Sequence, residues 1–318
     1  MSAALSAKVD VPLAYGQRAD AAAAAVLRQL LTVIAGNVDG AIIGTDPEYL
    51  HRLRIAVRRS RTVQRQLAAV FGPVELPGFR SEFRWLQRAT GEARDLDVYV
   101  EDLKSLRALL PESIRADLDP LRPGLVHWQL AARGEMGRAI SSLRASNLLA
   151  DWDRLLESIV ESPVEDRPSA TRPIGVVTGQ RIRKVYKRIV SMGRAIDDSS
   201  PAEAYHEVRK TGKELRYLLE LFAVKLFPEE VVAPMVKSLK GLQDALGRHQ
   251  DREIQIAVLR SLAEEVATLP RGGAACMAMG VLVDRLQADE RAARQEFGRH
   301  FEQFASKSQR ALVRRTFV

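Results

Sequence analysis

Apolar residues recur at spacings of three and four along almost the whole chain, which is the period of an amphipathic α-helix. We find no stretch in which polar and apolar residues alternate as they do in a half-buried strand. Ala, Leu, Arg, Glu and Gln dominate, and all five favour helices. The pattern predicts an all-α protein of about eight helices, at residues 18–43, 46–71, 78–109, 113–158, 173–195, 201–226, 229–267 and 273–306.

One segment between the predicted helices is suited to be a linker. It contains Pro163, Pro168 and Pro173 and little apolar material, and proline disfavours helix because it lacks a backbone N–H. The prediction is a first four-helix half, a linker, a second four-helix half and two tails, at residues 16–160, 161–175, 176–306, 1–15 and 307–318.

The two halves carry similar sequences. HRLRIAVRRSR (51–61) aligns with HEVRKTGKELR (206–216), and LQRATGEARDLDV (86–98) aligns with LQDALGRHQDREI (242–254) in almost the same register. Two matches in the same order predict an internal duplication. The expected architecture is two four-helix bundles related by a pseudo-two-fold axis.

The two helices that carry the first motif also have similar starts. The stretches from Thr45 to Glu48 and from Ser200 to Glu203 both match a capping box, with proline in the first turn.

The net charge of the chain indicates what kind of partner it binds. The 318 residues include 48 Lys+Arg and 40 Asp+Glu, a net charge of +8. Such a surplus points to a polyanion: a nucleic acid, an anionic membrane or a phosphate polymer. The single cysteine, Cys276, excludes an internal disulfide and a multi-thiolate zinc site.

Neither a signal peptide nor a membrane span is expected. Lys8 and Asp10 interrupt the N-terminal region. The most apolar window, residues 21–43, contains Arg28 and Asp39 and reads as a buried or amphipathic helix. We expect a cytoplasmic protein that does not enter membranes.

The basic residues of the repeated motif share one face of each predicted helix at 100° per residue. They are His51, Arg54, Arg58, Arg61 and Arg65 in the first copy and His206, Arg209, Lys213 and Arg216 in the second. Like charges at this spacing repel by a few tenths of a kcal/mol per pair, and no acidic residue occurs from 49 to 74. We expect an external anion to neutralise the stripe; a solvated basic face is the alternative.

Other basic groups on nearby predicted helices are candidates to extend the stripe. Arg80, Arg84 and Arg88 share a helix face, as do Arg181, Lys184 and Arg188, and Lys237 and Lys240 are the second-half counterparts of the first group. From these, the predicted site takes Arg84, Arg88, Lys184, Lys237 and Lys240.

Together these motifs resemble the CHAD family, the conserved histidine α-helical domain. The resemblance rests on HRLRIAVRRSR (51–61), GEARDLDV (91–98), HEVRKTGKELRYLLELF (206–222) and LQDALGRHQD (242–251), and it extends over about residues 16–305. It implies two four-helix bundles around a basic central cavity that binds inorganic polyphosphate. It carries over as binding positions His51, Arg54, Arg58, Arg61, His206, Arg209, Lys213 and Arg216.

The second copy departs from the first at two points. Gln250 stands where the first copy has Arg94, and Glu220 stands where it has Arg65. The two halves are therefore expected to hold an anion unequally.

Three alternatives stay open. The Glu48/His51 and Glu203/His206 pairs have the Glu-x-x-His spacing of di-iron bundles, although Arg54 and Arg209 on the next turn oppose a divalent cation. Four acidic residues could hold Mg²⁺ for phosphoryl transfer, although pairing with arginine is favoured; they are Asp95, Asp97, Asp251 and Glu253. Duplex nucleic acid is the third alternative, although no recognition motif is visible. Among the other histidines, His249 could reach the site.

The preferred hypothesis is a non-catalytic protein that binds inorganic polyphosphate and uses no cofactor or metal. Polyphosphate has no bases, so its site needs closely spaced cations and no stacking platform. The chain has only 3 Trp, 6 Tyr and 9 Phe. Association with polyphosphate granules is compatible with this hypothesis, and nucleic acid is the second-ranked partner.

Overall fold

The structure is a computed structural model that describes residues 4–197 and 199–318. In this part of the chain all regular elements are helical, and the only β-type pairing is an isolated bridge between Arg18 and Pro173. The all-α prediction is confirmed. The α-helices of residues 16–160 are α1 (Ala19–Ile43), α2 (Pro47–Gln66), α3 (Glu75–Ala89), α4 (Gly91–Ala108), α5 (Leu121–Ile140) and α6 (Leu143–Ser158). The α-helices that follow are α7 (Ile174–Arg194), α8 (Ala202–Leu218), α9 (Val224–Leu226), α10 (Glu229–Ala267), α11 (Gly272–Phe304) and α12 (Lys307–Thr316).

Three short non-α segments complete the described elements. Two are 3₁₀ turns, η1 (Ala68–Val70) and η2 (Glu112–Leu118). The third is a π-helical turn, η3 (Leu219–Ala223), which joins α8 to α9.

Two helices predicted as continuous are broken in the structure, so those predictions were wrong. The predicted helix 78–109 is divided at Thr90, and the predicted helix 113–158 is divided at Ser141 and Ser142. At the second break the Ser142 hydroxyl accepts a hydrogen bond from the N–H of Ala145 at 3.3 Å, which starts α6. No proline or glycine stands at Thr90 or at Ser141 and Ser142, which is why the periodicity concealed these two breaks. The predicted helix 113–158 is interrupted once more, at Pro120, where the 3₁₀ turn η2 gives way to α5.

The predicted capping boxes are also wrong in their details. At α2 the cap is Asp46, whose Oδ1 accepts from the N–H of Glu48 at 2.8 Å. At α8 the cap residue is Pro201, which has no side-chain acceptor. Ser200 instead accepts from the N–H of Asp197 at 3.0 Å. Both helices nevertheless begin where the sequence places them.

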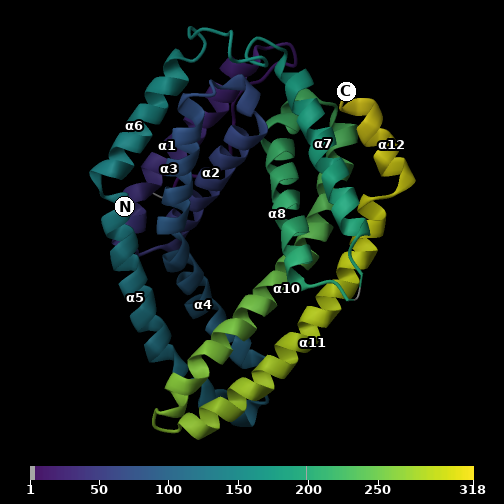
Figure 1. The fold of residues 1–318 in the computed structure, drawn as a ribbon. Helices are drawn as coiled ribbons and strands as arrows, with labels where there is room; N and C mark the ends of the chain where they lie inside the picture. Colours follow the sequence, from purple (N-terminus) through teal and green to yellow (C-terminus); the bar gives the residue numbers. More distant parts are fainter. Residues whose placement is uncertain (1–3, 198) are drawn as a thin grey trace.

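The helices form two arms that converge at both ends of the molecule (Figure 1). One arm contains α1, α2, α3 and α6, and the other contains α7, α8 and α12 with parts of α10 and α11. A large apolar cluster extends through both arms and includes Trp152, Phe83, Phe222 and Phe317. α1 is long and apolar enough to cross a membrane, but it is a core helix here: it packs against α2, α6 and α7, and Leu27, Leu30 and Ile34 are buried.

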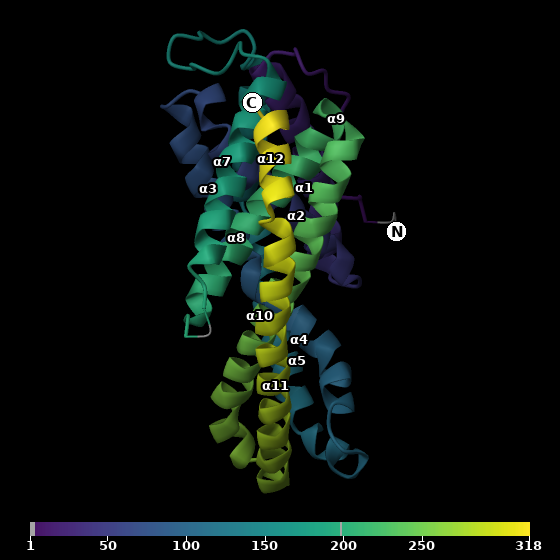
Figure 2. The ribbon, with the colours of Figure 1, turned by 90° about the vertical axis from the view of Figure 1, so that its right-hand side faces the viewer.

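A second apolar cluster joins the two arms at their lower end. It combines leucines of α4, η2 and α5 with residues at the end of α10 and the start of α11. Figure 2 shows α4 and α5 beside α10 and α11 in the lower part of the molecule. Leu106, Leu118, Leu259 and Leu282 belong to it. The two sequence halves therefore share a core at this end. The predicted duplication itself stays a prediction.

Residues 307–318, expected to be a tail, form α12 and pack against the second arm. Val313 and Phe317 are buried, and the Phe317 ring lies 4.8 Å from the ring of Phe227. In the N-terminal segment, Val9 is buried against the core as well. The sequence division into halves and tails therefore underestimates how much of the chain is packed.

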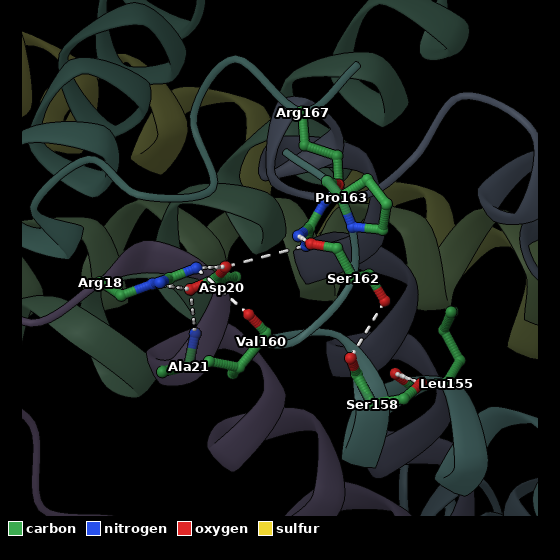
Figure 3. Close-up of polar contacts among 9 residues, drawn as sticks. All are labelled: Arg18, Asp20, Ala21, Leu155, Ser158, Val160, Ser162, Pro163 and Arg167. Carbon is green, nitrogen blue, oxygen red and sulfur yellow. Dashed lines mark hydrogen bonds and ion pairs between the residues drawn. The ribbon is translucent and has the colours of Figure 1, made fainter. Parts of the chain in front are cut away.

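The connection between α6 and α7 is held in place by a buried carboxylate (Figure 3). Asp20 is fully buried at the start of α1 and accepts hydrogen bonds from Arg18 at 2.7 and 3.1 Å. The guanidinium of Arg167, also buried, lies 3.8 Å from the same carboxylate and donates to the carbonyl of Pro163 at 2.8 Å. Asp20 thus connects this loop to the first arm.

Replacing Asp20 by alanine should lower the free energy of unfolding by about 3–5 kcal/mol, because it leaves the buried Arg167 charge without a carboxylate. The matched control is Asp153→Ala, which removes a half-exposed pair with Arg28 and should cost less than about 1 kcal/mol. Urea denaturation of both variants provides the comparison. Equal losses for the two variants would refute the role given to Asp20.

Candidate functional site: a basic cleft between the arms

The N-terminal part of the predicted basic stripe on α2 faces the other arm. His51, Arg54 and Arg58 line a cavity of about 420 Å³. The opposite face of the helix carries Leu53 and Val57, which are fully buried in the core. The apolar face of α2 therefore fixes the direction of its cations.

The second arm and the α4 and α10 helices complete this cavity. α8 contributes Arg209 and Lys213, and α4 contributes Arg94. The full lining is His51, Arg54, Ile55, Arg58, Arg94, Asp95, Val98, Tyr99, Asp102, Arg209, Lys213, Asp251, Ile254 and Gln255. Cations from both arms therefore share one concave space.

Arg54 is the most enclosed of these cations. It is 6% exposed and donates to the carbonyl of Gln87 and the hydroxyl of Thr90, both at 2.9 Å. Burial, with the charge of Arg58 second, lowers its pKa to about 10. Because Gln87 and Thr90 lie where α3 ends, Arg54 supports that helix end as well as the cavity wall.

Lys213 has the most strongly perturbed amine in the site. Burial first, and then the charges of Arg209 and Arg58, lower its pKa to about 7 against the opposite effect of Asp251. An amine with this pKa gains a proton readily when an anion arrives.

The two motif histidines are not equivalent. His51 lines the cavity, and its pKa is lowered by burial first and then by the charge of Arg94. His206 is not part of the cavity wall; its Nδ1 is hydrogen-bonded to Oε1 of Gln250. Arg94 and Gln250 occupy equivalent positions in the two aligned motifs. His51 therefore has an arginine nearby, whereas His206 is bonded to a glutamine.

A second group of cations extends from the upper part of α2 to α3. The pKa of Arg61 is lowered by burial and then by the charges of four other arginines, Arg65, Arg84, Arg80 and Arg88. Arg61 donates to the side chain of Gln87 on α3. The predicted inclusion of Arg84 and Arg88 beside the stripe is consistent with this grouping.

Two of the predicted stripe residues have acidic partners from α8 and η3. Arg65 pairs with Glu214 at 2.7 Å, and Arg216 pairs with Glu220 at 2.5 Å. Glu220 also accepts from Arg59 of α2 at 2.6 Å. The stripe of α2, whose sequence has no acidic residue from 49 to 74, therefore receives carboxylates from the other arm, whereas Arg216 pairs with an acid four residues further along its own chain.

Nine of the fourteen predicted site residues are not part of the central cavity wall: Arg61, Arg65, Arg84, Arg88, Lys184, His206, Arg216, Lys237 and Lys240. Lys184, Lys237 and Lys240 are exposed, and none of them is among the residues of its wall. Lys237 and Lys240 do share a face of α10 with Asp251, and they precede it by about three to four turns of the helix.

The acidic candidates and His249 have other contacts. Asp97 is buried and pairs with Arg133 of α5 at 2.8 Å. Asp251 lies 3.7 Å from Arg209. His249 is buried, stacks on Tyr205 and lies 2.7 Å from Glu290, so it belongs to the core of the second arm and not to the cavity.

Metal-binding geometry is not seen in the described residues. Among residues 4–197 and 199–318, no group of three or more His, Cys, Asp or Glu side chains is arranged to hold a metal ion. Glu48, half of one Glu-x-x-His pair, forms an ion pair with Arg52 at 3.1 Å.

Nine of the fourteen wall residues were not predicted for the binding site, and Arg94, Tyr99 and Asp102 are among them. Arg94 lies in the second repeated motif, residues 86–98. Burial first, and then the carboxylates of Asp95, Asp102 and Asp251, raise the pKa of Tyr99. The signal available in the sequence for Arg94 was its place inside this repeated motif, which continues into α4.

The fold and the cleft together define an all-helical protein with a concave, cation-lined site. The family model described as the CHAD domain matches residues 25–260. The chain belongs to the CHAD domain family.

Solved structures and sequence relatives agree with this assignment. The crystal structure of the CHAD domain from the plant Ricinus communis is similar, with a TM-score of 0.76, 25% identity, and coverage of 93% of this chain and 96% of that one. PptA from Streptomyces chartreusis has the same fold, with a TM-score of 0.70, 18% identity, and coverage of 90% and 99% respectively.

The proteins MT2285 and Rv2226, each from a strain of Mycobacterium tuberculosis, are 27% identical over 225 residues. This alignment covers 67% of this chain but 40% of either relative. The chain therefore matches less than half of the length of these two proteins.

Replacing Lys213 by methionine should raise the free energy of unfolding at pH 7, because it removes an amine that burial disfavours in its charged form. Between pH 7 and the ordinary lysine pKa of 10.5 the unfolded chain holds a proton that the folded chain has lost. The wild type therefore gains stability with rising pH, and the advantage of the variant should shrink by pH 10.

The control for this prediction is Lys210→Met, at an exposed lysine that pairs with Glu207. It should show no such convergence with the wild type. Urea denaturation at pH 7, 8.5 and 10 makes the measurement, and parallel pH profiles for wild type and Lys213→Met would contradict the burial of the amine.

Proposed function

We propose that the basic cleft binds inorganic polyphosphate and does not cleave it. The observation that carries the proposal is the convergence of Arg58 from α2 with Arg209 and Lys213 from α8 around one cavity. Burial first, and then the charges of Arg209 and Arg58, lower the pKa of the Lys213 amine, so these neighbouring charges repel one another. A bound polyanion relieves that repulsion.

The composition of the cleft favours phosphate over nucleotide ligands. Arginine offers two parallel donors that match phosphate oxygens. The one aromatic side chain of the wall is Tyr99, which is partly buried between α4 and the acidic side chains. Single-stranded nucleic acid depends on stacking platforms, and a cavity of about 420 Å³ does not admit a duplex.

The cations also continue beyond the cavity in one direction. Arg61 and the arginines of α3 extend the positive surface along α2, whereas Asp95, Asp102 and Asp251 occupy the side formed by α4 and α10. A linear anion is thus expected to enter between α2 and α8 and continue toward α3. Affinity should rise with chain length and fall with salt, because each added phosphate meets another cation and releases counterions.

The double variant Arg58→Glu/Lys213→Glu should weaken polyphosphate binding by about 100-fold or more. Two charge-assisted contacts contribute about 1.5 kcal/mol each, and 1.4 kcal/mol is tenfold in affinity. Calorimetric titration at about 0.15 M salt, with long-chain polyphosphate and with single-stranded and duplex DNA of matched charge, measures the effect.

The matched control is Lys104→Glu/Arg260→Glu, which reverses two exposed charges at the lower end of the molecule. It should bind as the wild type does. Undiminished binding by the Arg58/Lys213 variant would refute the site, tighter binding of DNA would refute the ligand, and shortening of the recovered polyphosphate would refute the absence of catalysis.

Binding should also take up protons, because bound phosphate raises the pKa of Lys213 from about 7. Affinity is therefore expected to fall as the pH rises from 6.5 to 8.5. The Lys213→Arg variant, which keeps its charge throughout this range, should show a flatter profile. Titrations in buffers of different ionisation enthalpy report the proton uptake, and identical uptake by both proteins would exclude Lys213 as the group that titrates.

A further inference from the structure

A second concave basic surface lies on the outer side of the second arm, between α7 and α12. This groove has a volume of about 400 Å³, and it shares no wall residue with the central cleft. Its cations are Arg183, Lys187, Arg194, Lys307, Arg310 and Arg314. The described residues that line it include no carboxylate.

The groove is formed by two helices packed in opposite directions (Figures 1 and 2). Gly193, at the end of α7, lies against Phe301, whereas Gly179 near its start lies beside Phe317. Between them the hydroxyl of Tyr186 donates to the carbonyl of Phe304 at 2.7 Å. These contacts hold both walls in fixed positions. α12 lies outside the segment 25–260 that the family model matches.

The cations of this groove have no internal partners. Across residues 4–197 and 199–318, none of the six forms an ion pair or a side-chain hydrogen bond. The Nε atoms of Arg183 and Arg310 are buried without an acceptor. Leaving a buried donor without an acceptor costs free energy. By contrast, Arg65 of α2 and Arg216 of α8 each have a carboxylate partner.

The sequence of both helices explains this lack of compensation. Neither α7 nor α12 contains an aspartate or glutamate. Basic residues three and four positions apart, such as Arg183 and Lys187 or Lys307 and Arg310, lie within about 6 Å along a helix and repel. Several negative charges placed between the helices would relieve this repulsion at once.

We propose that the α7–α12 groove is a second binding site for linear phosphate chains, separate from the central cleft. The paired donors of its arginines suit phosphate oxygens. The one ring in its wall, Tyr186, is 2% exposed and already hydrogen-bonded, so it offers no face for stacking a base. The site therefore fits a phosphate polymer better than a nucleic acid strand.

The test uses the full chain with the central cleft disabled by Arg58→Glu/Lys213→Glu and a short-chain polyphosphate as the probe. Calorimetry should give two sites for the wild type and one for this variant. Adding Lys187→Gln/Arg194→Gln/Arg314→Gln, three exposed positions, should weaken the remaining site at least tenfold. Hydrogen exchange should show polyphosphate-dependent protection in residues 183–194 and 307–316.

The matched control adds Lys104→Gln/Arg260→Gln/Arg285→Gln, which removes the same charge from exposed positions at the lower end of the molecule. It should leave the remaining site unchanged. Thermal unfolding and circular dichroism verify that each variant folds. If the groove triple variant loses its fold, the double variant Lys187→Gln/Arg314→Gln replaces it, with a smaller but measurable loss expected.

The proposal is overturned if the cleft variant binds no polyphosphate, or if its remaining site survives the groove substitutions. It is also overturned if single-stranded DNA of matched charge or vesicles of anionic phospholipid bind the groove more tightly than polyphosphate does. The groove triple variant in an otherwise wild-type chain separates the two hypotheses: a loss there, with full binding by Arg58→Glu/Lys213→Glu, supports the groove and refutes the cleft.

Discussion

Like charges on α2 and α8 face each other across the molecule, and the architecture depends on how that repulsion is contained. Glu214 accepts from Arg65 at 2.7 Å and from Gln66 at 2.5 Å, and so ties α8 to the end of α2. Glu220 accepts from Arg59 at 2.6 Å and makes a second connection. Both carboxylates neutralise cations at the upper end of the stripes and leave those of the cleft without this compensation.

Two further features hold the arms together: an apolar cluster and a buried ion pair. The lower cluster of leucines joins α4 and α5 to α10 and α11, and the Asp20 carboxylate fixes the loop that connects the arms. These contacts hold the elements that carry the cations of the cleft, although like charges repel. Burial first, and then the charges of Arg209 and Arg58, lower the pKa of the Lys213 amine there to about 7.

The second arm presents basic surfaces on two sides. α8 directs Arg209 and Lys213 into the cleft, and α7, packed against α8, directs Arg183 and Lys187 outward to the groove that α12 completes. The two surfaces differ in their acids: three aspartates line the cleft, and none lines the groove. In our proposals both surfaces receive phosphate chains, and only the cleft combines cations from both arms.

The sequence by itself determined the helical class, the basic faces of α2 and α8 and the starts of both helices, because helical periodicity and proline positions are local properties. It also placed Arg54, Arg58, Arg209 and Lys213 on those faces, and all four line the cleft. Tertiary structure decided the rest. In the structure α3 ends and α4 begins at Thr90, and the expected tail forms α12. His206 and Lys184 are not part of the cavity wall, whereas Arg94 is. Tertiary structure also brought Glu214 to Arg65 and Glu220 to Arg59. These outcomes depend on which helix packs against which, and contacts between residues more than a hundred positions apart leave no periodic signal in the chain.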